Sequence, residues 1–409
     1  MTQMKGRDPM SRRDKILAYA DAQYPEYRRI ALDIHARPET SNHEYFACET
    51  LSERLRQEGF EVKTDVAGHP TGFTAVYASG KPGPVLVFLA EYDALPGLGH
   101  GCGHNLFGAT SSLAAASLKQ VLDETGGEIR VYGTPGEEGG ENGSAKGSFV
   151  REGFFRDVDA ALCVHPGSDY HDVTHAEIAC APIRIAFQGK ASHASSNPQA
   201  GINALDALIL VFNAIGLLRQ QLPGDVRIHG IVTKGGDAPN IIPDNTEGRF
   251  YVRAATVKRM MDVYHKLEKI VEGAALQTGC TGLLEPTQRN LVHNIVPTPS
   301  FDRLYIKNLL SLGESYDPSR GAALGSSDVG NVSQVIPVIQ PMIRISETPV
   351  AGHSVEKREA CKSETGLESI RLGAKALALT ALDLLESPDL LRSIREEHDA
   401  AVKKQQEED

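Results

Sequence analysis

The chain has 409 residues, of which 41% are hydrophobic and 23% are charged, and its net charge is −11 at pH 7. This length exceeds the usual size of a single compact core, so we predict two domains in an ordinary globular protein. The acidic balance argues against nucleic acid or an anionic membrane as a partner, and no run approaches the ~18 apolar residues of a membrane span.

The N-terminus and the cysteines both favour a cytoplasmic protein. The first residues, MTQMKGRDPMSRRDK, are polar and lack the apolar core of a secretory signal, and Met10 is a second candidate start. The six cysteines show no framework spacing, which favours reduced thiols over disulfides.

The first part of the chain alternates helical and strand patterns. Apolar spacing, Ala-rich runs and β-branched runs predict helices over 13–39, 43–60 and 103–125, and strands over 72–79, 84–93, 127–133 and 159–165. The run PVLVFL is apolar enough to be buried on both faces. This alternation predicts an α/β domain with a mostly parallel sheet.

The pattern then changes to half-buried strands and two long helices. Strands are predicted over 181–189, 225–236 and 247–255, and helices over 201–222 and 257–279. We interpret this part as a smaller α+β domain inserted into the first, with one sheet face covered by the helices. The predicted organisation is 1–182 and 294–409 for the α/β domain and 183–293 for the insertion.

The last part is predicted to return to the first domain. It contains a helical pattern over 301–313, strand-like runs over 331–345 and a helical pattern over 366–387. The charged tail, REEHDAAVKKQQEED, is predicted to be frayed.

Polar clusters follow several of the predicted strands of the α/β domain. EYDALPGLGHGCGH follows PVLVFLA, TPGEEGG follows EIRVYG, HPG follows DAALCV, and GHSVE precedes the last long helix. Ligands bind outside the carboxyl ends of strands in open α/β sheets. We therefore expect these clusters to meet at one edge.

The donor atoms in these clusters suit zinc or a similar divalent ion, because thiolate, imidazole and carboxylate occur together. Of the adjacent pair, Glu138 is predicted as a ligand and Glu137 as the general base. The predicted ligands are Cys102, His104, Glu138, His165 and His353. Five donors suit two ions, zinc or manganese, that share a bridging ligand and a bridging water and lie about 3.5–4 Å apart.

The ordered motifs resemble those of a known superfamily. EYDALPGLGHGCGHN, GTPGEEGG, GKASHASSNPQAGINALDA, GGDAPNIIPDNTEGRFYVRA, SSDVGNVS and AGHSVE occur in this order and span nearly the whole chain. They resemble the aminoacylase/carboxypeptidase superfamily of di-metal amidohydrolases and peptidases. The most similar branch contains p-aminobenzoyl-glutamate hydrolase, indole-acetyl-amino-acid hydrolases and dipeptidases of the β-alanyl-lysine type.

The resemblance implies roles for further residues. Asp93 matches an Asp that supports the metal site, and the inserted domain matches a lid and dimerisation domain, which implies a homodimer. His193 matches a histidine that reaches the scissile carbonyl, often from the partner subunit. Asn240 and Arg253 match residues that grip the substrate, and an Arg suits the carboxylate of an amino-acid product. Asn105 replaces the Asp of many auxin-conjugate hydrolases, which favours the aminobenzoyl-glutamate and dipeptidase side.

The expected activity is therefore hydrolysis of N-acyl amino acids, aminobenzoyl-glutamate-like conjugates or dipeptides, with a β-alanyl-lysine-type dipeptidase as the alternative. Two other classes remain open. One is a thiol hydrolase with Cys102 as nucleophile and His104 as base, which should survive a chelator. The other is a silent binding protein, against which the retained ligands argue. His229 lies on a predicted strand and is assigned to packing.

Overall fold

The computed structural model describes residues 10–319 and 325–408, and the chain divides into two compact units. The large unit contains Met1–His175, Val296–Ala323 and Val332–Lys404. The small unit contains Ala176–Ile295, Leu324–Asn331 and Gln405–Asp409. The inserted segment predicted from the sequence, 183–293, falls inside the main segment of the small unit.

A six-stranded mixed sheet forms the centre of the large unit, in the order β1-β2-β4-β3-β5-β11. The pairings β4-β3, β3-β5 and β5-β11 are parallel, and β1-β2 and β2-β4 are antiparallel. The strands are β1 (Glu61–Val66), β2 (His69–Ala78), β3 (Val85–Ala90), β4 (Glu128–Gly133), β5 (Ala160–Leu162) and β11 (Val338–Ile339). A separate parallel pair joins β6 (His165–Pro166) to β12 (Met342–Ile343).

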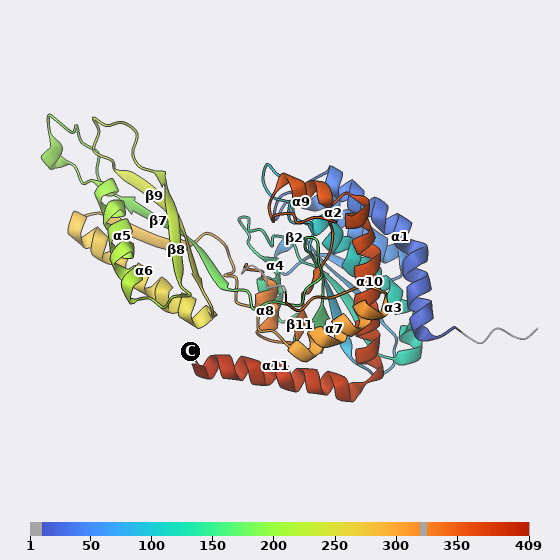
Figure 1. Ribbon diagram of the computed structural model, residues 1–409. Helices are drawn as coiled ribbons and strands as arrows, with labels where there is room; N and C mark the ends of the chain where they lie inside the picture. Colours follow the sequence, from blue (N-terminus) through green and yellow to red (C-terminus); the bar gives the residue numbers. More distant parts are fainter. Residues whose placement is uncertain (1–9, 320–324, 409) are drawn as a thin grey trace, which may run out of the picture. The chain divides into compact units, whose positions relative to one another are not determined.

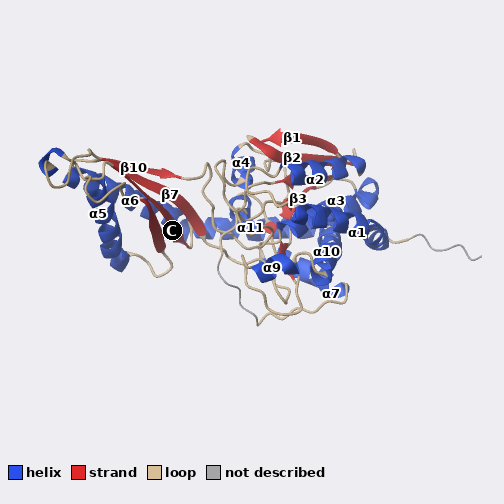
Figure 2. Cartoon of the chain, turned by 90° about the horizontal axis from the view of Figure 1, so that it is seen from above, coloured by secondary structure: helices blue, strands red, loops and turns tan. Residues whose placement is uncertain are grey.

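Helices pack against this sheet, and α3 contacts both α1 and α10 (Figures 1 and 2). Because α3 is Ala-rich and buried along nearly its whole length, its neighbours approach it closely on several sides. The helices are α1 (Arg12–Ala36), α2 (Tyr45–Gln57), α3 (His104–Thr125), α4 (Ala145–Arg151), α7 (Pro299–Ser311), α9 (Val355–Ala360), α10 (Glu364–Glu386) and α11 (Pro388–Glu408). A short helix, α8 (Val329–Ser333), lies at the boundary between the units in the sequence.

The small unit has a four-stranded antiparallel sheet in the order β10-β7-β9-β8. Its two long helices lie on one face of the sheet (Figure 1). Alternate residues of the strands therefore face the helices and the open side. The elements are β7 (Ala179–Gln188), α5 (Ala204–Leu218), β8 (Arg227–Lys234), β9 (Asn245–Ala254), α6 (Val257–Thr278) and β10 (Thr281–Pro286).

Capping residues in the sequence account for the ends of α6. The Thr256 side chain accepts a hydrogen bond from the backbone N–H of Arg259, and Gly279 follows the helix in the left-handed conformation at φ 76°. These are the residue types that satisfy orphan backbone groups at the two ends of a helix.

Two predictions for the end of the chain are wrong. The tail is the helix α11, not a frayed segment, because Leu391, Ile394 and His398 recur on one face and are buried. The His398 ring hydrogen-bonds through Nε2 to the Ser333 carbonyl oxygen, 2.8 Å away. In the segment 331–345, the first residues belong to α8, and only the short strands β11 and β12 form. The expectation that Met10 is a second start concerns residues 1–9, which lie outside the described part of the chain.

Candidate metal centre

The carboxyl ends of three neighbouring strands carry the predicted site residues. Strand β3 pairs in parallel with β4, with Ala90 opposite Gly133, and with β5, with Phe88 opposite Leu162. The strands therefore end at the same edge of the sheet, and the following turns meet there. This register explains why residues far apart in the sequence lie close together in the large unit.

A glycine sets the geometry of the first turn. Gly103 lies between Cys102 and His104 and adopts φ 97°, a left-handed conformation that favours glycine. A Cβ at Gly103 would lie 2.7 Å from the Pro166 Cβ, too close for any side chain. The turn leads directly into α3, which begins at His104. Both side chains consequently reach the same side of the site.

Hydrogen bonds orient two of the imidazole rings. His104 bonds through Nδ1 to Asp93 Oδ1 at 2.8 Å, and His165 bonds through Nδ1 to the Pro166 carbonyl oxygen at 3.0 Å. A carbonyl oxygen can only accept, so His165 Nδ1 carries the proton in that bond. Each ring therefore has its Nε2 left for the site, which is how metal-binding histidines are usually oriented.

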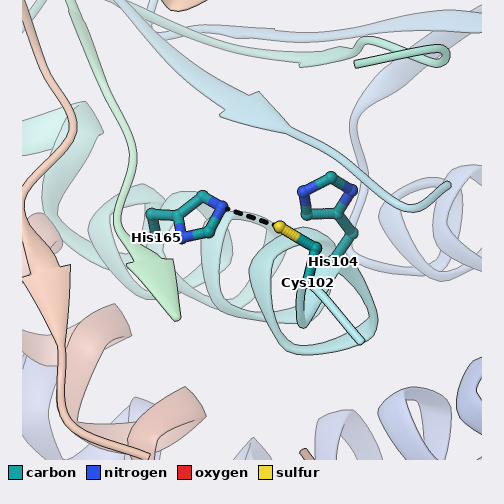
Figure 3. Close-up of side chains that lie close together, drawn as sticks. All are labelled: Cys102, His104 and His165. Carbon is teal, nitrogen blue, oxygen red and sulfur yellow. Dashed lines mark hydrogen bonds between the residues drawn. The ribbon is translucent and has the colours of Figure 1, made fainter. Parts of the chain in front are cut away.

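The donor atoms converge. Cys102 Sγ and His165 Nε2 are 3.4 Å apart, and Figure 3 shows His104 on the first turn of α3 beside them. Three groups each have all their donor atoms within 4.8 Å of one another: Cys102, His104 and His165; Cys102, Glu138 and His353; and His104, Glu137 and Glu138. All the residues predicted as ligands or base thus come together in the large unit.

His353 arrives from the segment before α9. Its backbone N–H donates to the Gly101 carbonyl oxygen at 3.2 Å, and its Nε2 lies 3.3 Å from Glu138 Oε1. Its φ of 55° is in the left-handed region, which costs a non-glycine residue roughly 1–2 kcal/mol. The surrounding contacts hold this conformation and direct the ring toward Glu138.

The charged side chains of the donor cluster shift one another's pKa values. Burial alone would raise the pKa of Cys102, but His104 and His165 hold it well below its usual value. Burial alone would lower the pKa of His104, but Cys102 and Asp93 hold it well above its usual value. Hydrogen bonds with Cys102 and Glu138 raise the pKa of His353 to about 10. A thiolate beside several imidazoles is a donor set that zinc-type ions prefer.

Ser41 and Glu44, which the sequence did not single out, form hydrogen bonds that support the site. Asp93 Oδ2 accepts hydrogen bonds from the Ser41 hydroxyl at 2.8 Å and the Glu138 backbone N–H at 2.9 Å. The Glu44 carboxylate accepts a hydrogen bond from the Gly136 backbone N–H at 2.9 Å. Burial, and to a smaller extent the nearby charge of Asp93, raise the pKa of Glu44 to about 8. This network fixes the turn that carries Glu138 and so its carboxylate.

A fully buried ion pair lies next to Nε2 of His104. Lys146 Nζ is 2.7 Å from Glu91 Oε1, and Glu91 Oε2 is 3.2 Å from His104 Nε2. All three side chains are 0% exposed, and buried lysines occur almost only when paired. Glu91 therefore places a carboxylate beside the His104 ring, and Lys146 balances the negative charge of that carboxylate.

Replacing Lys146 by Met should leave the Glu91 charge buried without its cation. We expect Lys146→Met to lower the free energy of unfolding by about 3–5 kcal/mol, measured by urea denaturation. The double variant Lys146→Met/Glu91→Gln should recover most of this loss. As a control, Lys63→Met removes an exposed lysine paired with exposed Glu61 and should stay within about 0.5 kcal/mol. A Lys146→Met protein as stable as the original would contradict the role of the pair.

The residues expected to bind substrate lie in the small unit. His193 and Asn240 are neighbours, because the Ala194 backbone N–H donates to the Asn240 carbonyl oxygen at 3.0 Å. His193 is exposed, and its Nδ1 accepts from the backbone N–H groups of Ser195 and Ser196 at 3.3 and 3.2 Å. Its Nε2 is therefore the nitrogen available to a substrate.

Arg253 lies on β9 and is half-buried. Its Nη1 donates to the Ser326 hydroxyl at 3.0 Å, and its Cζ lies 5.4 Å from the centroid of the Tyr251 ring. The assignment of His229 to packing is wrong: this side chain is exposed on β8 and stacks on Tyr251.

Comparisons with known proteins agree with this architecture. Residues 179–279 match the model of a peptidase dimerisation domain. The chain is 34% identical over 392 residues to the Xaa-Arg dipeptidase of Homo sapiens, covering 91% of this chain and 88% of that protein. It is 30% identical over 454 residues to one of the subunits of p-aminobenzoyl-glutamate hydrolase from Escherichia coli, covering 92% of this chain and 93% of that protein.

Solved structures share the fold. An aminobenzoyl-glutamate utilization protein from Klebsiella pneumoniae superimposes with a TM-score of 0.72 at 19% identity, covering 90% of this chain and 98% of that one. A dinuclear metal-binding peptidase of the M20 family from Bacillus subtilis superimposes with a TM-score of 0.64 at 18% identity, covering 90% and 99%.

The chain belongs to the M20 family of peptidases and amidohydrolases. It is a metal-dependent hydrolase of amide bonds, and the fold class inferred from the motifs, a catalytic α/β domain with an α+β dimerisation domain, is confirmed. Among the described residues, no helix is both long and apolar enough to cross a membrane.

Proposed function

We propose that the enzyme cleaves small amides that release an amino acid with a free carboxylate. The candidates are N-acyl amino acids, aminobenzoyl-glutamate-like conjugates and dipeptides, including the β-alanyl-lysine type. The relatives named above support this range, since one is an Xaa-Arg dipeptidase and another belongs to a p-aminobenzoyl-glutamate hydrolase. The observation that carries the proposal is the convergence of thiol, imidazole and carboxylate donors at one sheet edge.

The donor set fits two divalent ions, zinc or manganese. Cys102, His104 and Glu138 each belong to two of the three donor groups, and we propose Cys102 as the ligand that two ions would share. We assign Cys102, His104, Glu138, His165 and His353 as ligands. When bound, such ions supply Lewis-acid polarisation of the scissile carbonyl and lower the pKa of water.

The residues of the chain have separate tasks in this mechanism. Glu137 accepts the proton of the attacking water and passes it to the leaving amine. Asp93 holds the His104 ring through Nδ1. His193 donates from Nε2 to the developing oxyanion, in its own or the partner subunit, because its Nδ1 already accepts two backbone N–H groups. Asn240 and Arg253 hold the substrate, with Arg253 on the carboxylate.

We further propose a cytoplasmic homodimer. The matched dimerisation domain supports the dimer, as do exposed Ile231 and Val232 on the edge strand β8. All six cysteines are buried free thiols, which suits a reducing compartment.

The proposed role of His193 predicts that its removal lowers turnover but not metal content. His193→Ala should lower kcat by roughly one to three orders of magnitude, because removal of one oxyanion donor typically has an effect of this size. Metal content, measured by elemental analysis, should not change. His265→Ala alters another exposed histidine of the small unit and should have no effect. Loss of metal from His193→Ala would mean that His193 is a ligand.

The carboxylate clamp is tested with paired substrates. A panel of N-acyl amino acids, aminobenzoyl-glutamate and dipeptides is compared with the matching carboxamides. Free acids should be cleaved far better, by roughly ten- to a hundredfold in kcat/KM, since a charged hydrogen bond is worth about 1.5–3 kcal/mol. Arg253→Ala should remove this preference mainly through KM, whereas Arg249→Ala, at an exposed position on the same strand, should keep it. Equal cleavage of acids and carboxamides by the unmodified enzyme would exclude the clamp.

A further inference from the structure

The open face of the small unit's sheet carries an aromatic pair next to Arg253. On β9, the even-numbered Phe250 and Val252 are buried in the core beneath the helices, so Tyr251 and Arg253 point to the other face. His229 is paired with Tyr251 across the β8-β9 ladder. The three side chains therefore share one face of two adjacent strands.

These side chains form an ordered stack. The rings of His229 and Tyr251 have centroids 5.5 Å apart and planes inclined by only 19°, and the Arg253 guanidinium lies 5.4 Å from the Tyr251 centroid. Ser326 Oγ holds the guanidinium at Nη1. Burial and the charge of Arg253 lower the pKa of His229.

An exposed stack of this kind has flat, apolar surface available for contact. Tyr251 is 41% exposed, and His229 is also exposed. Aromatic surface prefers planar partners, which are aromatic rings or a guanidinium. Residues two apart on a strand are about 6.6 Å apart. If Arg253 binds the carboxylate of an amino acid, the side chain of that amino acid can therefore reach the exposed surface of Tyr251.

We propose that His229 and Tyr251 form a stacking platform for the side chain of the released amino acid, and that this platform selects flat side chains. The proposal rests on the proposed function, because it takes Arg253 as the carboxylate-binding residue. Its ligand is a substrate whose C-terminal residue has a planar side chain, aromatic or guanidinium. The platform determines specificity and takes no part in the chemical step.

The test uses dipeptides with one fixed N-terminal residue and C-terminal residues matched in size or charge. Phenylalanine is compared with cyclohexylalanine, and arginine with lysine. The unmodified enzyme should prefer the planar member of at least one pair by about three- to tenfold in kcat/KM, mainly through KM. The pair that shows the preference identifies the platform's ligand as aromatic or guanidinium. Equal values within both pairs would overturn the proposal, while cleavage of all four dipeptides would still support the proposed function.

Variants separate the platform from other roles of the same residues. Tyr251→Leu and His229→Leu should abolish the planar preference, because each removes one flat ring of the platform. Leu283→Ala, at an exposed position on the far edge strand β10, should keep the preference. If His229 and Tyr251 only position Arg253, the variants would instead lose the preference for free acids over carboxamides, and this loss would be the same whatever the C-terminal side chain. If the pair is a contact between subunits, they would change the mass in solution. Either result would overturn the proposal.

Discussion

Glu137→Gln should lower kcat by about two or more orders of magnitude while the protein retains its metal. Glutamine keeps the shape of the side chain but cannot accept a proton from water. The Glu137 side chain is 11% exposed, and its Oε2 lies 3.9 Å from His104 Nε2. The carboxylate therefore lies beside the donor atoms and is still partly open to solvent. The measurement is steady-state kinetics together with elemental analysis of the same sample.

A matched control comes from the same turn. Glu141 is 69% exposed and pairs with His43 at 2.9 Å, so Glu141→Gln should have nearly the original kcat. A Glu137→Gln enzyme that stays active with its metal in place would show that another group is the base. Loss of metal from this variant would instead place Glu137 among the ligands.

The cluster of donor atoms was largely predictable because three of the turns that carry donors follow strands of the same sheet. Parallel strands bring their carboxyl ends to one edge, so Cys102, Glu138 and His165 needed no distance information to be grouped. The turn at Gly103 was also readable, since a glycine between two donor residues indicates a tight backbone turn. The structure brings these donors together, whereas their roles as ligands stay predictions.

The supporting residues were not predictable in the same way. Lys146 and Glu44 are single charged residues in a sequence where charged residues usually face solvent. Their burial follows from long-range packing that brings Lys146 to Glu91 and Glu44 to Gly136. Local pattern contains no information about such partners.

Edge strands and the C-terminal helix show the same limit. Strand β1 is mostly exposed, and its pairing with β2 is a contact that the local sequence pattern cannot show. In α11, the numerous charges concealed an apolar stripe that includes Leu391 and Ile394. The substrate-binding residues of the small unit were identified only through the resemblance, because an exposed His193 or Asn240 has no chemical signature of its own.

Removal of the metal should abolish activity, and restoring it should return close to two ions per chain. Because the ions supply the polarisation and the acidity of water, we expect a loss of at least about two orders of magnitude after dialysis against a chelator. Zinc and manganese are then added back separately, and bound metal and activity are measured in the same samples. The untreated enzyme carried through a mock dialysis is the control.

The outcome separates three roles of Cys102. A thiol hydrolase would keep its activity after chelation, because Cys102 and His104 would suffice as nucleophile and base. If two ions share Cys102 and act together in the reaction, we expect activity to return only as the second ion is bound. This expectation follows from the two donor groups that have Cys102 in common, one with His104 and His165 and the other with Glu138 and His353. Full activity with one ion per chain would leave metal-dependent hydrolysis intact but exclude a shared Cys102.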